Sequence, residues 1–595
     1  MSYQAPLKEM AFVMNQLAGL SDVCKLPAYQ ESELDTEMTQ AILEESAKFA
    51  QEVLDPLNWP ADCEPGTFSG DQVFTAKGFK EAYQLFTTGG WQGVFHPQEY
   101  GGQGLPKLVA TACTEMMNSA NLSFSLCPLL TDGAIEALMT AASDSLKNQF
   151  LPNMISGKWT GTMNLTEPQA GSDLALVRTK AISQVDGTYQ IFGTKIYITY
   201  GEHDLAENII HLVLARTPDA PEGVKGISLF VVPKFLVNED STLGQRNDVH
   251  CVSIEHKLGI KASPTAVLKF GENGGAIGYL VGQENRGLEY MFIMMNAARF
   301  NVGMQGVSVS ERAYQRAVQY AKDRLQSRDL AGSTGPVAII HHPDVKRMLL
   351  TMRAYTQATR SLAYVGAAAQ DFAHDAESEE EKLWSQAFFE FLVPIIKGFS
   401  TEISVEVASL GIQVHGGMGY IEETGAAQHF RDARILPIYE GTTAIQANDL
   451  VGRKTLRDGG KVAKRIAKEI EKTEQQLALN ASEAALSMLT YLKAARGSFE
   501  EVVDYVVANT KEDIKAVFGG SVAYLKLAGL TLSGWQMARG LLIAQQLRKE
   551  DPDFYSAKIT TSLFFAEHML TQVPGLAIAV TQGGKNINTM SAEQF

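Results

Sequence analysis

The chain has 595 residues and a mass of 64.8 kDa, more than one hydrophobic core usually supports, so several domains are expected. Hydrophobic residues make up 45% and charged residues 20%, a composition that excludes a largely disordered protein. The formal net charge of −16 disfavours binding to nucleic acid or anionic lipid. Because no run of about 18 uninterrupted apolar residues is present, we predict no stable membrane span.

The five cysteines are scattered along the chain and never occur in CxxC spacing. This pattern argues against a disulfide framework and a zinc site, and we expect no metal centre. The N-terminal segment has neither a basic stretch followed by an apolar core nor the Arg/Ser bias of a transit peptide. We therefore expect a bacterial cytoplasmic location.

The first half of the chain predicts a helical domain followed by a β domain. After an N-terminal extension at 1–34, residues 35–160 are helical, and Asp35 can cap a helix over 37–54. Between 161 and 283 the apolar segments are short, β-branched or aromatic, and bounded by Gly, Pro, Asn or Asp. No helical pattern separates them, which favours a small antiparallel β domain.

Helical periodicity returns at 284 and continues to the C-terminus. Residues 284–454 predict a helical bundle in which segment 391–410 is helical but interrupted at Pro394. The acidic run 375–381 predicts a solvated turn between two helices. Residues 455–595 predict an additional helical domain. The fold class is therefore mainly α with a central β domain.

Several common catalytic motifs are missing from the sequence. It contains no GxGxxG between strand and helix, no GxxxxGK[ST], no HExxH and no GxSxG. Nicotinamide-binding Rossmann, P-loop and zinc-hydrolase functions therefore lose their main support.

Two polar segments can carry chemistry. In the loop 165–173, exposed amides and the hydroxyls of Thr166 and Ser172 could meet a polar ring or a carbonyl, although an ordinary capped turn explains the same residues. In the second, 413–443, glycines allow close backbone approach, and Thr442 or Thr443 can cap a helix beginning at Ala444. Glu440 lies in this segment next to the apolar residues Ile438 and Tyr439, so its carboxylate is a candidate for chemistry. A carboxylate that is simply exposed to solvent is the alternative interpretation.

Together these segments resemble the acyl-CoA dehydrogenase family of flavoproteins. Five elements match in order, and they are Thr166–Asp173, Lys195–Thr199, Arg324–Gln326, His415–Tyr420 and Tyr439–Thr442. The resemblance covers about residues 35–454. The extra C-terminal region is similar to that of a larger subgroup, which includes dehydrogenases of 3-methylmercaptopropionyl-CoA and bacterial enzymes acting on medium-to-long acyl chains.

The resemblance implies roles for individual residues. Residues expected to bind FAD are Met163, Leu165, Thr166, Tyr197, Thr199, His342 and Thr442. Residues expected to reach the FAD of a second subunit are Arg324, Gln326, Gln413, Gly416 and Gly417. Residues expected to contact the acyl-CoA substrate are Ser172, Asn296, Arg299 and Gly441. Glu440 matches the catalytic base.

The expected reaction is α,β-desaturation of an acyl-CoA thioester, a step of fatty-acid β-oxidation, with electrons passing to an electron-transferring flavoprotein. A free glutamate has a pKa of about 4.3 and is a poor base, so expulsion of water must raise its pKa. Some family members carry the base at the position of Ala298, which cannot accept a proton here. The resemblance also implies a homo-oligomer. We expect a dimer, because residues 455–595 are predicted to cover the surface that a second dimer would otherwise cover.

Two other functions are compatible with the same scaffold. An acyl-CoA oxidase would reoxidise its flavin with O₂, and sequence does not separate it from a dehydrogenase. A DNA-binding flavoprotein would need a basic face, which the acidic net charge disfavours.

Overall fold

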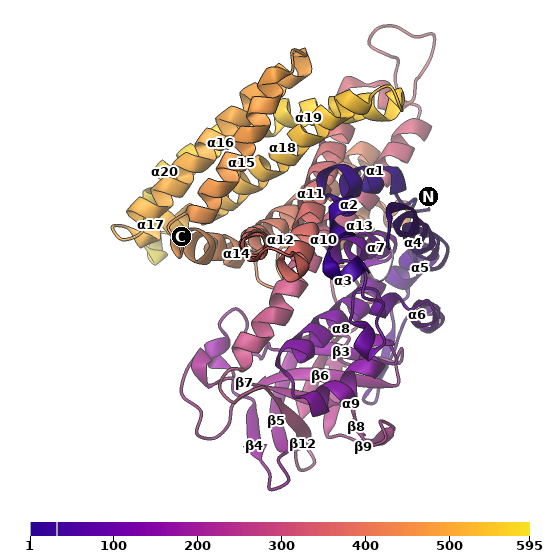
Figure 1. Ribbon diagram of the computed structural model, residues 1–595. Helices are drawn as coiled ribbons and strands as arrows, with labels where there is room; N and C mark the ends of the chain where they lie inside the picture. The colour runs from indigo at the N-terminus through magenta and orange to yellow at the C-terminus, as the bar shows by residue number, and fades with distance from the viewer. Residues whose placement is uncertain (1, 31–33) are drawn as a thin grey trace.

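The computed structural model describes residues 2–30 and 34–595, so residues 1 and 31–33 of the predicted extension lie outside the described part. A central sheet lies at one end of the molecule and the C-terminal helices lie at the other, with a helical body between them (Figure 1). This is the predicted fold class, mainly α with a central β domain.

The N-terminal region is helical, as predicted. Its elements are α1 (Leu7–Phe12), α2 (Leu20–Val23), α3 (Pro27–Gln30), α4 (Thr36–Phe49), α5 (Asp55–Cys63), β1 (Thr67–Ser69), β2 (Gln72–Phe74), α6 (Phe79–Thr88), α7 (Lys107–Ala120), α8 (Leu122–Ala141) and α9 (Asp144–Ile155). The Asp35 carboxylate accepts a hydrogen bond from the Met38 amide at 2.7 Å, so the predicted N-cap is confirmed.

The central sheet contains eight strands, seven of them in the order β10-β11-β5-β12-β7-β6-β3, with β4 also paired to β5. The strands of the β domain are β3 (Trp159–Asn164), β4 (Lys180–Ser183), β5 (Tyr189–Thr199), β6 (Asn208–Ala215), β7 (Ser228–Pro233), β8 (Phe235–Val237), β9 (Leu243–Arg246), β10 (Val249–Ile254), β11 (Thr265–Phe270) and β12 (Ala276–Val281). The expected antiparallel pairing holds except between β3 and β6, which are parallel. The long excursion through β4 and β5 allows the chain to re-enter the sheet in the same direction.

Strand β6 is buried on both faces of the sheet. Its residues Ile210, Leu212 and Leu214 pack in the cluster formed with α8 and α9. Val213 and Ala215 point to the opposite layer, which β5, β10 and β11 contribute.

Three long helices form the helical bundle, and two short ones complete it. They are α10 (Gly287–Asp323), α11 (Pro343–Asp375), α12 (Glu379–His415), α13 (Ala426–Ala433) and α14 (Thr443–Asp449). The turn predicted over the acidic run 375–381 is shorter than expected: it spans 376–378, while Asp375 ends α11 and Glu379–Glu381 form the first turn of α12. The predicted interruption at Pro394 is wrong, because α12 continues through it. Pro394 is buried in the bundle, and packing on several sides outweighs the lost helical hydrogen bond.

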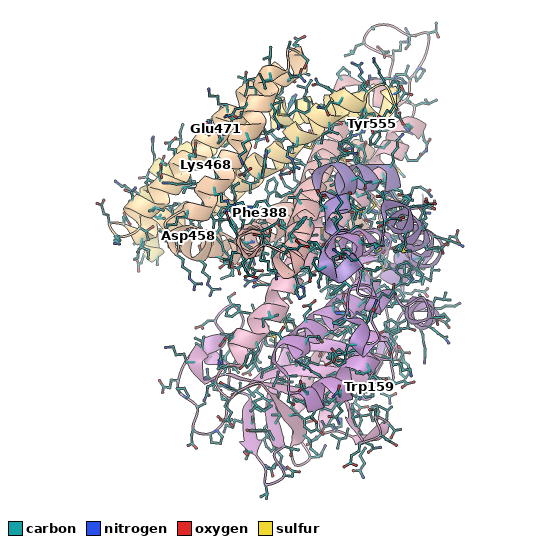
Figure 2. The ribbon with its side chains drawn as sticks, in the orientation of Figure 1. Trp159, Phe388, Asp458, Lys468, Glu471 and Tyr555 are labelled. Carbon is teal, nitrogen blue, oxygen red and sulfur yellow. The ribbon has the colours of Figure 1, made fainter. Side chains whose placement is uncertain are left out.

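The C-terminal region forms a further helical unit that packs on the bundle. Its helices are α15 (Lys461–Leu479), α16 (Glu483–Asn509), α17 (Ile514–Gly519), α18 (Ser521–Leu547), α19 (Pro552–His568) and α20 (Val573–Ile587). Helix α18 is apolar around most of its circumference because it packs against both α11 and α12. Phe388 of α12 lies at this boundary (Figure 2), with its ring 6.5 Å from that of Trp535.

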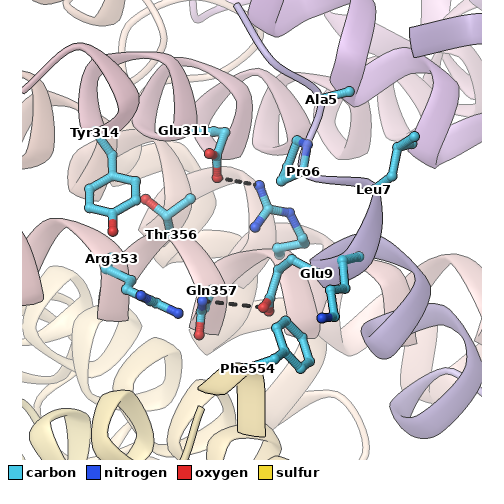
Figure 3. Close-up of a pocket in the computed structure, with 12 residues that line it drawn as sticks. Ala5, Pro6, Leu7, Glu9, Glu311, Tyr314, Arg353, Thr356, Gln357 and Phe554 are labelled. Carbon is cyan, nitrogen blue, oxygen red and sulfur yellow. Dashed lines mark hydrogen bonds and ion pairs between the residues drawn. The ribbon is translucent and has the colours of Figure 1, made fainter. Parts of the chain in front are cut away.

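The N-terminal segment ties the bundle to the C-terminal helices. Ala5–Glu9 lie over α10, α11 and α19 around a cavity of about 410 Å³ (Figure 3). There the buried Glu9 carboxylate accepts from Lys558 Nζ at 2.5 Å and from Gln357 Nε2 at 3.2 Å. These contacts join residues more than 500 positions apart in one buried network.

Two stretches of the described chain are long and apolar enough to cross a membrane by composition alone. For Leu122–Ala141, 83% of the apolar window is buried inside the protein, as expected of a core helix. For Pro552–Ile587 the buried share of the apolar window is 39%. A short 3₁₀ turn at Leu570–Gln572 divides this stretch into α19 and α20. Neither stretch is an uninterrupted apolar run, so they are weak evidence for a span.

Candidate active site

A cavity of about 1200 Å³ lies between the β domain and the bundle. Its walls come from the loop after β3, from β5, from 255–260, from α10 and from the segment 431–453. Ten of the predicted site residues line it together, and they are Met163, Leu165, Thr166, Ser172, Tyr197, Thr199, Arg299, Glu440, Gly441 and Thr442. The two polar segments identified in the sequence therefore meet at one cavity.

The loop after β3 is held in place by a buried ion pair. Glu167 Oε1 lies 2.8 Å from Lys195 Nζ of β5 and also accepts from the Thr179 hydroxyl at 2.6 Å. The other oxygen of Glu167 accepts from the Arg178 amide at 2.8 Å. The Lys195 charge and these donors outweigh burial and hold the pKa of Glu167 well below its usual range. Glu167 therefore anchors the loop, which leaves Thr166 and Ser172 at the cavity.

Tyr197 presents its ring to the cavity from an irregular part of β5. The pairing of β5 with β11 shifts register between Ile198 and Lys195, and Tyr197 has a left-handed φ of 60°. A β-bulge of this kind re-aims a side chain, and 61% of the Tyr197 surface is exposed. An exposed aromatic ring on the cavity wall is the feature expected of a residue that packs against a ligand.

Glu440 lies in a strained turn between α13 and α14. Glu440 and Gly441 both have left-handed φ angles, 54° and 90°, and such a conformation costs a non-glycine residue about 1–3 kcal/mol. A Cβ atom on Gly441 would lie 2.7 Å from Gln446 Nε2, so this position requires glycine. Thr442 caps α14, which begins at Thr443 and not at Ala444 as predicted.

The environment of Glu440 suits a base. Burial raises the pKa of its carboxyl above the ordinary value, and the charges of Lys397 and Arg299 oppose that rise. In the described residues, neither the carboxylate nor the backbone N–H of Glu440 has a hydrogen-bond partner within the protein. Both groups are therefore available to a molecule in the cavity, the carboxylate as an acceptor of a proton and the amide as a donor.

The two predicted substrate contacts on α10 are placed differently. Arg299 lines the cavity, is 4% exposed, and lies 3.8 Å from the Asp449 carboxylate. Its Nε has no hydrogen-bond partner among the described residues, which leaves a buried donor free. Asn296 is exposed on the same helix and does not line the cavity.

Six predicted cofactor residues lie outside this cavity, where α10 and α12 end. They are Arg324, Gln326, His342, Gln413, Gly416 and Gly417. His342 Nε2 lies 2.8 Å from the carbonyl oxygen of Gln326, and the ring of His415 stacks on Tyr320 at 4.2 Å between centroids. Exposed apolar side chains adjoin them, namely Leu325, Leu330, Met418, Tyr420 and Ile421.

Sequence reasoning missed two buried residues that hold the Glu440 turn. Lys397 Nζ donates to the Leu436 carbonyl at 2.9 Å and to the Gly441 carbonyl at 2.6 Å. Gln446 Nε2 donates to the Gly441 carbonyl at 3.2 Å. A lone lysine in the apolar run 391–400 was the available signal, because such a charge is rarely buried without a partner.

Comparison with known families matches nearly the whole chain. Residues 36–158, 162–272 and 285–454 match the N-terminal, middle and C-terminal domains of acyl-CoA dehydrogenases, respectively. Residues 463–591 match a domain described as "Acetyl-CoA dehydrogenase C-terminal like". The chain therefore belongs to the acyl-CoA dehydrogenase family of oxidoreductases.

Individual relatives agree with this assignment. A 3-methylmercaptopropionyl-CoA dehydrogenase from Ruegeria pomeroyi is 52% identical over 99% of this chain and 100% of its own length. A butyryl-CoA dehydrogenase from Syntrophomonas wolfei is 34% identical over 100% of this chain and 99% of its own. The structure of Caenorhabditis elegans ACDH-11 in complex with C11-CoA has a TM-score of 0.76, with 20% identity, 96% of this chain covered and 92% of the other. That likeness supports the fold.

Proposed function

We propose that the protein is an FAD-dependent acyl-CoA dehydrogenase in which Glu440 removes the α proton of an acyl-CoA thioester. The observation that carries this proposal is the placement of Glu440. It lines the large cavity, burial raises its pKa, and among the described residues neither its carboxylate nor its backbone N–H has a hydrogen-bond partner.

The cavity has the features that a flavin requires. The exposed ring of Tyr197 offers a flat apolar face, and Thr166 and Thr199 bring hydroxyl groups to the same wall. We propose that Met163 and Leu165 complete this wall and that Thr442 contacts the adenosine-diphosphate part. When bound, FAD supplies an acceptor for the hydride that leaves the β carbon.

The protein's own residues perform the proton transfer. An α proton next to a thioester is too weakly acidic for an unaided carboxylate, so the carbonyl must be polarised by donors where negative charge develops. The free N–H of Glu440 supplies one such donor beside the carboxylate. Exclusion of water by the acyl chain raises the pKa of Glu440 further, and Glu440 accepts the proton at its carboxylate. We propose that Ser172, Asn296, Arg299 and Gly441 position the substrate.

The 52% identical relative favours 3-methylmercaptopropionyl-CoA as the substrate, and linear acyl-CoAs of medium-to-long chain are the second candidate class. The electron acceptor in this proposal is an electron-transferring flavoprotein. We place the protein in the bacterial cytoplasm, in keeping with its bacterial relatives.

Anaerobic mixing of the purified flavoprotein with acyl-CoAs tests this function. We expect the flavin absorbance to bleach within seconds with a good substrate and the enoyl-CoA product to form in equal amount. A panel containing the thioether substrate and straight-chain acyl-CoAs ranks the substrates. Rapid peroxide formation on admitting air would identify an oxidase, and failure of every acyl-CoA to bleach the flavin would contradict the proposal.

The residues outside the cavity support a homodimer. We propose that Arg324, Gln326 and the Gln413–Gly417 loop reach the cofactor of a second subunit, and that His342 also contacts cofactor. The exposed apolar side chains beside them are what a subunit interface would bury.

Light scattering of the native protein is expected to give a mass near twice 64.8 kDa. Replacing both Leu325 and Tyr420, two of these exposed side chains, by aspartate is expected to produce monomers that lose FAD. The same double substitution at Leu479 and Leu486, exposed apolar residues of the C-terminal helices, serves as the control. A native monomer that retains FAD would contradict the dimer.

A further inference from the structure

Lys397 projects from α12 into the turn that carries Glu440. Its side chain is fully buried, and its ammonium donates to the carbonyls of Leu436 and Gly441 at 2.9 and 2.6 Å. One of these carbonyls precedes Glu440 and the other follows it. The lysine therefore bridges the two ends of the left-handed turn.

Burial of an ammonium in this place needs an explanation. The surrounding run of α12 is apolar, and a charge in such surroundings is costly unless donors and charges compensate it. The two carbonyls satisfy two of the three ammonium hydrogens. The remaining compensation is electrostatic, and Glu440 is its largest source.

We infer that Lys397 is a positioning residue for Glu440: it fixes the turn that aims the carboxylate into the cavity and supplies the positive charge that keeps this carboxylate ionised. The inference rests on the proposed function, since it concerns the same base. Other residues of the turn strengthen the arrangement, because Gln446 shares the Gly441 carbonyl and Thr443 N–H closes the turn on the Pro437 carbonyl at 3.0 Å.

Several other ionisable groups surround the pair and set its electrostatic background. They are Arg299, Asp449 and Arg453 on the side of α10 and α14, Glu402 on α12, and the Tyr439 hydroxyl. Burial lowers the pKa of Lys397 to about 7, and the Glu440 charge opposes that decrease. Both positive groups lower the pKa of Glu440, and Lys397 lowers it more than Arg299 does.

The test compares Lys397→Met with the native holoenzyme in anaerobic single-turnover flavin reduction from pH 5 to 9. Loss of the ammonium removes a charge that favours the carboxylate, so the acidic limb of the rate profile is expected to move up by about one unit or more. The rate at pH 7 is expected to fall at least about tenfold because the turn is no longer fixed. Binding of a nonreactive CoA thioether without the carbonyl is expected to change less than about threefold.

A matched control is Lys558→Met, which removes another buried, hydrogen-bonded lysine far from the cavity. It is expected to lower the melting temperature and leave the pH profile in place. An unchanged profile in Lys397→Met, or an equal shift in Lys558→Met, would overturn the inference. Should Lys397→Met fail to fold, Lys397→Arg and Lys397→Gln replace it, since only the first keeps the charge and should keep the native acidic limb. Native protein that acyl-CoA does not reduce would refute the proposed function instead.

Discussion

Replacing Glu440 by glutamine is expected to reduce the rate of flavin bleaching by roughly 10²–10⁴-fold, the contribution usual for a positioned acid or base. Glutamine keeps the volume of the side chain and the backbone N–H but cannot accept the α proton. The left-handed turn remains, because Lys397 and Gln446 hold its carbonyls and make no hydrogen bond to the carboxylate. Stopped-flow absorbance of the flavin measures this effect directly.

Glu406 offers a matched control for this substitution. It is a second glutamate of the bundle, exposed on α12, whose pKa is raised by partial desolvation, and it does not line the cavity. Glu406→Gln is expected to bleach within about threefold of the native rate. Should Glu440→Gln retain the native rate with normal FAD content, another group takes the proton and the proposed mechanism fails.

Replacing Arg360 by methionine is expected to give the largest loss of stability, about 3–5 kcal/mol in the free energy of unfolding. Its guanidinium is buried where α7, α10 and α11 meet. There Nη2 donates to Glu115 at 2.6 Å and to Glu311 at 2.7 Å, and the Tyr364 hydroxyl donates to Glu115 at 2.8 Å. Without the arginine, two carboxylates remain buried and repel each other.

Urea denaturation of the holoenzyme checks this result, and Arg347→Ala provides the comparison. Arg347 also lies on α11 and pairs with Asp344 at 2.8 Å, but both side chains are exposed. Surface pairs of this kind contribute about 0–1 kcal/mol. Equal losses in the two variants would show that the buried network adds nothing specific to the fold.

Much of the site could be predicted from the sequence because its polar residues stand in short, distinctive segments. The loop 165–173 and the Tyr439–Thr442 turn each have a recognisable pattern of Gly with Pro or Thr. In the turn, the left-handed backbone and the Thr442 cap explain that pattern. Their meeting at one cavity is a property of the tertiary fold, and the family resemblance supplied it.

The contact of Lys397 with the Glu440 turn could not be predicted from the sequence. Lys397 is about forty positions from Glu440, and no local pattern links a helix interior to a turn beyond α13. The predicted interruption at Pro394 failed for a related reason, since packing around α12 outweighs the local preference of proline. The parallel pairing of β3 with β6 was missed because strand direction depends on the path of the whole β domain.

A contact behind the Glu440 turn joins that turn to the C-terminal helices. Gly398 follows Lys397 on α12, and a Cβ there would lie 2.5 Å from Leu525 of α18 and 3.2 Å from Gln446. Helix α18 of the C-terminal unit therefore packs directly behind α12 and α14, the two helices that hold the Glu440 turn. A chimera that exchanges this region with a relative must carry a matching α12 and α14 surface. Otherwise we expect the proposed base, Glu440, to be misaligned even though every motif residue is intact.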